Sequence, residues 1–254
     1  METKEQVRQQ FGRVAARYAA SPVHAWGPSL DAMIEAARLT GRERVLDVGC
    51  GPGHTALAFA PRSGEVVALD LSAEMLEAGR ALAAERGVGN LRFEQGDVEN
   101  LAFEPGSFDV VTSRVSAHHY SDPDRALREI ARVLVPGGLF LLVDSVAPED
   151  DEQDAFFDLI ERTRDPSHLH NWRISEWQAK LRAAGYEAAL LGTWRWTLDF
   201  TAWVERMETP PESVAVLRAA FAGASDALKR GFRIRDNADW EIPVALLEGR
   251  LPGP

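Results

Sequence analysis

The sequence predicts an α/β protein built on a doubly wound, mostly parallel β-sheet. Between residues 44 and 144, short apolar runs alternate with segments in which apolar residues recur at helical spacing. A glycine-rich turn directly follows the first apolar run, and acidic residues lie at or just after the ends of the next two. Strands that alternate with helices require crossover connections, which place the strands in parallel with helices on the faces of the sheet.

Helices are expected both ahead of the first strand and between the strands. Residues 4–39 carry apolar residues at helical spacing, with breaks at Ser21-Pro22 and Gly27-Pro28, so two or three helices precede the sheet. The strands of the first half are expected over residues 44–48, 66–70, 91–95, 108–113 and 139–144. The helices between them are expected over residues 54–60, from residue 72 onward and over residues 123–134.

The second half of the chain loses this regular alternation. Its helical segments are expected over residues 155–164, 175–184 and 201–231, the last interrupted by Pro210-Pro211, and its strands over residues 186–200 and 240–246. No linker rich in Gly or Ser separates the two halves, which favours a single domain over residues 1–254.

Composition excludes several classes of function. Of the 254 residues, 45% are apolar and 26% are charged, a balance typical of a globular chain. The net charge of −11 repels phosphate groups, which disfavours nucleic acid and anionic membrane surfaces as partners. Cys50 is the single cysteine, so no internal disulfide can form, and we expect a cytoplasmic protein. We expect neither a signal peptide nor a membrane span, because no apolar run is long enough.

The turn after the first strand lies where open α/β sheets bind their ligands. Its glycines, Gly49, Gly51 and Gly53, follow the spacing G-x-G-x-G, which differs from the G-x-G-x-x-G of dinucleotide-binding turns. Asp47 lies two residues before the first glycine, and its carboxylate would repel a pyrophosphate but attract a cationic group. The turn therefore indicates a ligand that is positively charged at this point.

Two further carboxylates follow the neighbouring strands. Asp70 ends the second predicted strand about 20 residues after the first glycine, the offset at which an acidic side chain accepts hydrogen bonds from ribose hydroxyls. Asp97 follows the third strand, where it could accept from the exocyclic amine of adenine. Three acidic residues at the carboxyl ends of successive strands, one beside a glycine turn, predict a nucleoside-binding edge.

Taken in order, these motifs resemble those of class I S-adenosylmethionine (SAM) dependent methyltransferases. The resemblance rests on the glycine turn, on Asp70 and on the segments Gly96 to Val98, Phe108 to Val111 and Val135 to Leu139. The sequence is similar in particular to the small-molecule branch of this family, which includes the ubiquinone and menaquinone C-methyltransferases. It implies SAM as cofactor, S-adenosylhomocysteine as product, and the class I methyltransferase fold, a Rossmann-like sheet with helical lid additions.

The resemblance also implies how the chain is divided and what reaction it performs. Residues 1–40 would form an N-terminal helical cap, residues 41–147 the cofactor-binding core, and residues 148–254 an acceptor-side half with helical inserts. The reaction would move the SAM methyl group to carbon, oxygen or nitrogen of a small organic acceptor by in-line displacement. Two alternatives stay open, an NAD-dependent oxidoreductase and a non-catalytic SAM-binding regulatory protein.

The resemblance implies a set of cofactor-binding residues. Asp47, directly or through water, and the glycine turn would face the methionine part of SAM, and Asp70 would bind the ribose. The full set is Tyr18, Asp47, Gly49, Cys50, Gly51, Gly53, Asp70, Leu71, Met75, Asp97, Val98, Ser113 and Arg114.

Histidines are the natural candidates for a general base, because their side chains titrate near neutral pH. His118 and His119 follow the fourth strand, beside the expected methyl group. In a strand-like segment they would point to opposite sides, so at most one would face the acceptor. His168 lies in a segment that resembles a loop near the acceptor pocket of some relatives. These histidines and His170 lack the spacing of a known metal motif, and we expect no metal.

Aromatic residues concentrate in the C-terminal half. Trp194 and Trp196 would share one face of a strand, with Arg195 on the other. Where such a face meets a pocket, it suits a flat, apolar or aromatic acceptor.

Overall fold

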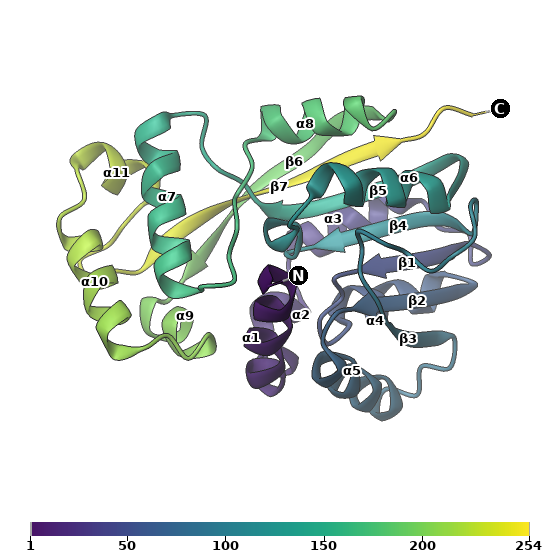
Figure 1. The fold of residues 1–254 in the computed structure, drawn as a ribbon, viewed down its shortest axis with the longest axis horizontal. Coiled ribbons are helices and arrows are strands. Elements are labelled where there is room, and N and C mark those ends of the chain that lie inside the picture. Colours follow the sequence, from purple (N-terminus) through teal and green to yellow (C-terminus); the bar gives the residue numbers. More distant parts are fainter. Residues whose placement is uncertain (1, 254) are drawn as a thin grey trace.

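The computed structural model describes residues 2–253, arranged around a seven-stranded sheet (Figure 1). The strand order is β3-β2-β1-β4-β5-β7-β6, in which the first five pair in parallel and β7 runs antiparallel to both its neighbours. The strands are β1 (Arg44–Val48), β2 (Glu65–Asp70), β3 (Leu91–Gln95), β4 (Phe108–Arg114), β5 (Leu134–Ser145), β6 (Glu187–Leu198) and β7 (Trp240–Arg250). The predicted doubly wound, mostly parallel sheet is confirmed. Met1 and Pro254, the ends of the predicted domain, lie outside the described residues.

Helices cover both faces of this sheet. Val45 and Leu46 are neighbours in β1, yet they pack into separate apolar cores, because successive side chains of a strand point to opposite faces. The core around Val45 includes Leu30 from α3, and the core around Leu46 includes Leu127 from α6. The helices of the first half are α1 (Glu2–Ala19), α2 (Pro22–Ala25), α3 (Pro28–Ala37), α4 (His54–Phe59), α5 (Ala73–Glu85) and α6 (Pro123–Val133).

The helices of the second half gather around the far ends of β6 and β7, at the left of Figure 1. They are α7 (Asp151–Arg164), α9 (Phe200–Arg206), α10 (Pro211–Ala222) and α11 (Asp226–Gly231), whereas α8 (Ile174–Ala183) packs beside α6. Trp203 and Trp240 are buried at the centre of this group, with ring centroids 5.1 Å apart. Helical inserts are thus attached to the same continuous sheet that carries the glycine turn.

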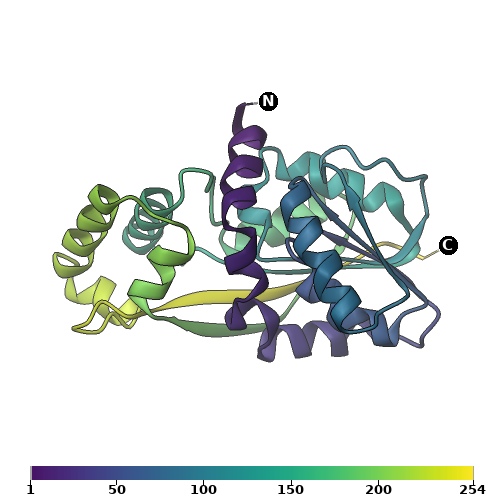
Figure 2. The ribbon, with the colours of Figure 1, turned by 90° about the horizontal axis from the view of Figure 1, so that it is seen from below.

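Helix α1 lies between the helical group and the first half of the sheet, as both ribbon views show (Figure 2). The Gln10 side-chain amide donates to the Met207 carbonyl at 2.9 Å, which ties α1 to the end of α9. At its start, Lys4 Nζ lies 2.6 Å from Asp97 Oδ2, which ties α1 to the loop after β3. The N-terminal helix therefore bridges the two halves over the carboxyl ends of the strands.

Two sequence predictions are corrected here. The segment with His118 and His119 is a 3₁₀ turn over Ala117–His119, not a strand-like segment, because Val115 adopts a left-handed conformation (φ 57°) that turns the chain directly after β4. The last parallel strand begins at Leu134, five residues earlier than predicted, since the chain stays extended through Pro136. This early part pairs with β4 only at Leu134, and regular pairing resumes at Leu139 after a register shift.

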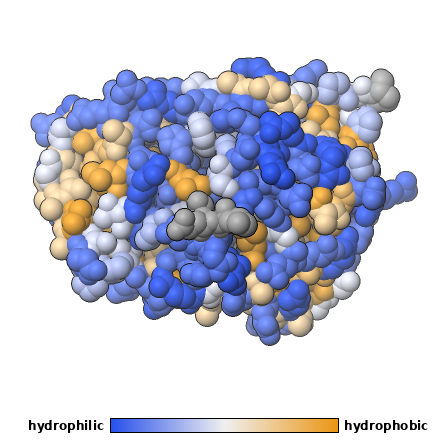
Figure 3. All heavy atoms as spheres, in the orientation of Figure 1, coloured by the Kyte–Doolittle hydropathy of each residue, from blue (hydrophilic) through white to orange (hydrophobic). Residues whose placement is uncertain are grey.

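Hydrophilic residues predominate on the face drawn in Figure 3, in keeping with the 26% of charged residues in the chain. Among residues 2–253, no helix combines the length and the apolar character needed to cross a membrane. The large apolar side chains with substantial exposure are Trp26, Leu159, Leu190, Leu191 and Val216.

Candidate functional site

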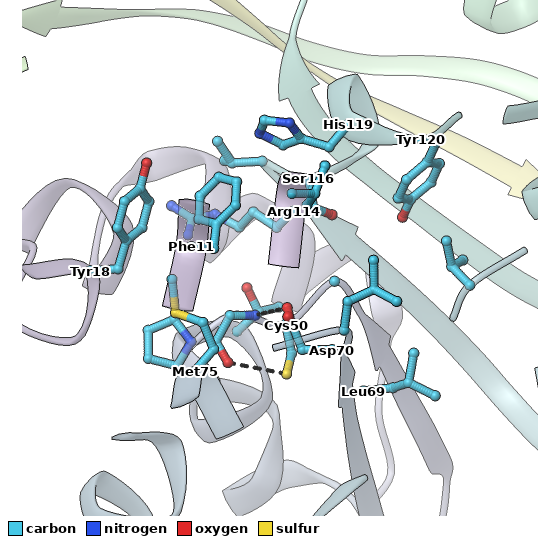
Figure 4. Close-up of a pocket in the computed structure, with 18 of the residues that line it drawn as sticks. Phe11, Tyr18, Cys50, Leu69, Asp70, Met75, Arg114, Ser116, His119 and Tyr120 are labelled. Atoms are coloured by element: carbon cyan, nitrogen blue, oxygen red, sulfur yellow. Dashed lines mark hydrogen bonds between the residues drawn. The ribbon is translucent and has the colours of Figure 1, made fainter. Parts of the chain in front are cut away.

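A cavity lies over the carboxyl ends of β1, β2 and β4, beneath α1 (Figure 4). Phe11 and Tyr18 of α1 line it on one side, and the glycine turn lines it on the other. Of the predicted cofactor-binding residues, those that line it are Tyr18, Gly49, Cys50, Gly51, Asp70, Leu71, Met75, Asp97, Val98 and Arg114. The strand-end residues that are far apart in the sequence therefore do meet in one place.

The three turn glycines have different roles. All three adopt left-handed φ angles, +62° at Gly49, +52° at Gly51 and +78° at Gly53. A Cβ on Gly49 would lie 2.5 Å from Ser116 Oγ, and one on Gly53 would lie 2.8 Å from the Phe93 ring, so close packing requires both glycines. A Cβ on Gly51 would meet nothing closer than Met75 Sδ at 3.9 Å. Gly51 thus presents bare backbone to the cavity, whereas Gly53 does not line it.

Asp47 lies beneath the turn and does not line the cavity. Its carboxylate accepts hydrogen bonds from Thr112 Oγ1 at 2.8 Å and from the Ala56 amide at 3.2 Å, and the residue is 1% exposed. Burial raises the pKa of Asp47 to about 7, because a charged carboxylate is poorly solvated there. Asp47 fastens β1 to β4 and to α4, which excludes direct contact from the cavity wall, and a contact with the methionine part of SAM through water stays a prediction.

Asp70 links the turn to the start of α5. Its two oxygens accept from the Gly51 amide at 2.8 Å and from the Ser72 amide at 2.9 Å. Burial raises the pKa of this carboxyl, while the backbone amides oppose the rise. The carboxylate is therefore held rigidly at the cavity wall, as required to accept bonds from a pair of hydroxyl groups.

Asp97 has a partner that sequence reasoning missed. Lys4 Nζ lies 2.6 Å from Asp97 Oδ2 and 2.5 Å from Glu99 Oε2. The Glu99 amide donates to the second oxygen of Asp97 at 2.9 Å. The first turn of α1 thus closes the end of the cavity where Asp97 and Val98 lie.

The opposite end of the cavity holds an incompletely bonded cation. Arg114 ends β4, is 8% exposed, and donates from Nη1 to the His24 carbonyl at 2.7 Å. Its Nε and Nη2 are buried without a hydrogen-bond partner among the described residues, and so is Nδ1 of His54. Burial lowers the pKa of Arg114 to about 10. The two free guanidinium nitrogens of Arg114 fit an anionic group such as the carboxylate of an amino acid.

Ser113 lies behind the cavity rather than at its surface. Its hydroxyl is within 3.0 Å of Ser116 Oγ and 2.9 Å of the Tyr120 hydroxyl, and the residue is fully buried. Ser116 and Tyr120 line the cavity instead. The structure therefore places Ser113, which was predicted to bind the cofactor, behind the cavity lining.

A second cavity continues from the first. Phe11, Tyr18, His24, Val115 and His119 line both. Its apolar walls come from β6, β7 and α9 and consist of Trp196, Leu198, Trp203, Ile242 and Val244. Its further polar lining consists of His118, Ser145, Glu161, Arg164, Asp165 and Arg206. A molecule in this space would lie directly beside one in the first cavity.

The alternation predicted for β6 is confirmed in part. Trp194 and Trp196 are half-buried and Arg195 is exposed, so the two indoles do share a face. Only Trp196 reaches the second cavity, where the Arg114 guanidinium carbon lies 5.4 Å from its ring centroid.

His118 is held by a carboxylate at the end of β5. Nδ1 of His118 lies 2.7 Å from Asp144 Oδ1, and the His118 amide donates to Asp144 Oδ2 at 3.0 Å. Burial lowers the pKa of His118, but the Asp144 carboxylate outweighs this effect and the net pKa is raised. Asp144 was not predicted as a site residue, although it lies one residue before the end of β5 and Asp70 lies at the end of β2.

His119 lies against the same wall, so the prediction that the two rings point to opposite sides is wrong. The ring centroids of His118 and His119 are 4.3 Å apart, and both side chains line the second cavity. His119 Nδ1 lies 3.0 Å from the Ser167 carbonyl, and its ring meets Phe11 edge-on at 4.9 Å. Burial, together with the nearby His118, lowers the pKa of His119 to about 4, so this ring is neutral near pH 7.

His168 lies one layer deeper. It is 3% exposed, its ring stacks on His118 at 5.2 Å, and it is not among the residues that line either cavity. Its Nε2 is 3.1 Å from the Asn171 side-chain nitrogen. The structure therefore places His168 behind His118 rather than against an acceptor.

Comparisons with known proteins agree with this geometry. A family model described as a methyltransferase domain matches residues 46–142, from β1 into β5. The uncharacterized methyltransferase YcgJ of Bacillus subtilis is 41% identical over 227 residues, which are 89% of this chain and 90% of YcgJ. The ubiquinone/menaquinone biosynthesis C-methyltransferase UbiE of Idiomarina loihiensis is 39% identical over 109 residues, 41% of this chain and 43% of UbiE.

Solved structures extend the similarity to most of the chain. The crystal structure of YcgJ has a TM-score of 0.85 at 38% identity and covers 89% of this chain and 99% of its own. The crystal structure of the BH2331 protein of Bacillus halodurans C-125 also has a TM-score of 0.85, at 35% identity, over 89% of this chain and all of its own. The match to UbiE, in contrast, covers less than half of either chain.

Proposed function

Because this chain belongs to the SAM-dependent methyltransferases, we propose that it methylates a small organic molecule bound in the second cavity, with His118 as general base. The observation that carries the proposal is the hydrogen bond of 2.7 Å between His118 Nδ1 and Asp144, on the wall of that cavity. An NAD-dependent oxidoreductase is no longer an alternative.

The first cavity would hold SAM through the residues described above. Asp70 would accept from the ribose hydroxyls, Leu71 and Met75 would pack on the adenine, and Asp97 would accept from its amine. The free Nε and Nη2 of Arg114 would bind the carboxylate of the methionine part. When bound, SAM supplies a sulfonium methyl group that the acceptor displaces in line.

His118 would take the proton that the acceptor loses. With the proton on Nδ1 donated to Asp144, the lone pair of the neutral ring lies on Nε2. No hydrogen-bond partner for Nε2 is found among residues 4–253, so this atom remains available to an acceptor. Asp144 is the positioning residue: its hydrogen bonds to both the ring and the amide of His118 fix the ring orientation.

A general base is needed only when the acceptor must lose a proton to react. This requirement favours a phenol, an enol or a quinol, methylated at oxygen or at the adjacent carbon, over a neutral amine. The apolar walls of Trp196 and Trp203 suit a planar ring. The partial similarity to UbiE, named as a C-methyltransferase, is consistent with such an acceptor.

We propose that the chain works as one domain in three parts. Residues 1–40 would cap both ligands, residues 41–147 would hold SAM, and residues 148–254 would shape the acceptor cavity. The ties of α1 to Asp97 at one end and to Met207 at the other support this division.

A methyl-transfer screen tests the proposed function. The purified chain is incubated with methyl-labelled SAM and a panel of phenols, quinols and amines, and labelled products are identified. We expect transfer to phenols or quinols, and a loss of about 100-fold or more in kcat for His118→Gln with SAM affinity retained. His170→Gln, at a partly exposed histidine outside both cavities, is the matched control. Transfer to amines alone, or full activity of His118→Gln, would contradict the proposal.

A further inference from the structure

Arg206, at the end of α9, lines the second cavity without an ion-pair partner among the described residues. Its Nε is buried without a hydrogen-bond partner among the described residues, and no ion pair joins Arg206 to a carboxylate of residues 4–253. The neighbouring Arg164, in contrast, has both an ion-pair partner and a hydrogen-bond partner. Nη1 of Arg164 pairs with Glu161 at 3.2 Å, and its Nε donates to the Trp203 carbonyl at 3.1 Å.

The carboxylates that line or adjoin this cavity are already engaged. Glu161 pairs with Arg164, and Asp165 accepts from the amide and the hydroxyl of Ser167 at 2.8 and 2.6 Å. Asp144 forms a hydrogen bond with the His118 ring. Arg206 is therefore left without a carboxylate at ion-pair distance among the described residues, although it lines a cavity that also contains Glu161 and Asp165.

The pKa values of His24 and Arg206 reflect burial and the positive charges gathered here. The pKa of His24 lies well below its usual value, through burial first and then through the charges of Arg206 and Arg114. The pKa of Arg206 is itself lowered, by burial and by Arg164. Burial and the nearby guanidiniums therefore disfavour a proton on His24, and burial disfavours the charged form of Arg206 itself.

We propose that the methyl acceptor carries a carboxylate, which pairs with Arg206 while the ring of the acceptor lies along Trp196 and Trp203. This inference rests on the proposed function of the second cavity as the acceptor site. A single negative charge fits better than the two of a phosphate, because one guanidinium is unpaired and Glu161 and Asp165 lie on the same cavity wall. The acceptor is thus an aromatic acid rather than a neutral quinol.

The test compares matched probes that differ only in charge. Binding of 4-hydroxybenzoate and 4-hydroxybenzamide, and of the corresponding hydroxynaphthoate and naphthamide, is measured by calorimetry on the chain saturated with S-adenosylhomocysteine. We expect at least one acid to bind about tenfold or more tightly than its amide, which corresponds to about 1.4 kcal/mol. Arg206→Gln should abolish this preference and Arg206→Lys should retain much of it.

A control variant separates this site from the overall charge of the protein. Arg230→Gln removes an exposed cation of α11 that does not line the cavity, and it should leave the preference unchanged. Melting temperatures of all variants verify that they fold. The proposal is overturned if no acid in the panel binds more tightly than its amide, or if Arg206→Gln keeps the preference.

The outcomes also separate this inference from the proposed function. Methyl transfer to phenols without any preference for acids would contradict the proposal that the acceptor carries a carboxylate. It would leave the assignment of the second cavity as the acceptor site unchanged. A preference for acids that depends on Arg206, without transfer to any phenol, would support the anion site and refute the phenolic acceptor.

Discussion

His118 and Asp144 contact each other twice, through the ring Nδ1 at 2.7 Å and through the backbone amide at 3.0 Å. A carboxylate that bonds both the ring and the backbone of one histidine leaves that ring a single orientation and a single neutral tautomer. Asp144 is 1% exposed, and its Oδ1 also accepts from the Ser145 amide at 2.8 Å, so the carboxylate itself is fixed. The pair therefore presents Nε2 of His118 in a defined position.

The pH dependence of methyl transfer follows from this contact. The imidazole accepts a proton only when it is neutral, and Asp144 holds the pKa of His118 above 6.5 despite burial. We expect kcat/KM to rise with pH through a pKa above 6.5. Asp144→Asn removes the charge that contributes most to raising the pKa but leaves the burial that lowers it, so the rise should move to lower pH and kcat should fall about 100-fold. Rate profiles between pH 5 and 9 measure both effects.

A second histidine–aspartate contact provides the control for this profile. His170 Nδ1 lies 3.7 Å from Asp158 Oδ1, and neither residue lines the cavities. Asp158→Asn should leave the profile unchanged. An unshifted profile in Asp144→Asn would mean that the pH dependence belongs to another group.

Asp70 is expected to contribute directly to SAM affinity. Asp70→Asn keeps the shape of the side chain but removes the charge from the hydrogen bonds with ribose hydroxyls, so SAM binding should weaken by about 1–3 kcal/mol. Calorimetric titration measures the change. Asp109→Asn, at a carboxylate that accepts from the Arg44 amide at the other edge of the sheet, is the control. Equal affinity in Asp70→Asn and the wild type would show that Asp70 does not meet the ribose.

The sequence predicted the first cavity far better than the second, for a physical reason. Parallel strands bring their carboxyl ends to one edge, so Asp70 and Asp97 could be assigned together from their positions after strands. Arg164 and Arg206 come from helices whose docking depends on tertiary packing, and no periodic pattern marks them. The turn at His118 escaped prediction because Val115 adopts a left-handed conformation that β-branched residues rarely take.

Substitutions at Gly51 and Gly87 distinguish the effect of backbone strain from the effect of losing a contact with the ligand. An alanine Cβ at this position would enter the cavity, and the left-handed φ of +52° would also cost about 1 kcal/mol in stability. Gly51→Ala should therefore weaken SAM binding about tenfold or more and lower stability only modestly. Gly87→Ala carries the same strain at φ +65° with no atom within 4 Å, so it should lose stability alone. Denaturant titration measures the stability of both variants, and calorimetry measures their affinity for SAM. Undiminished SAM affinity in Gly51→Ala would count against the turn as a ligand site.

Arg114 allows the two ends of SAM to be tested separately. Its free Nε and Nη2 should bind the carboxylate of the amino-acid part, which S-adenosylhomocysteine has and 5′-methylthioadenosine lacks. Arg114→Met should weaken binding of S-adenosylhomocysteine about tenfold, since a charge-assisted hydrogen bond contributes about 1.5–3 kcal/mol, and leave methylthioadenosine binding nearly unchanged. Arg44→Met is matched, because the Arg44 guanidinium also lies 5.4 Å from an aromatic ring, that of Phe108, but outside both cavities. Equal losses for the two ligands in Arg114→Met would indicate that the substitution disturbs the fold of the cavity rather than a carboxylate contact.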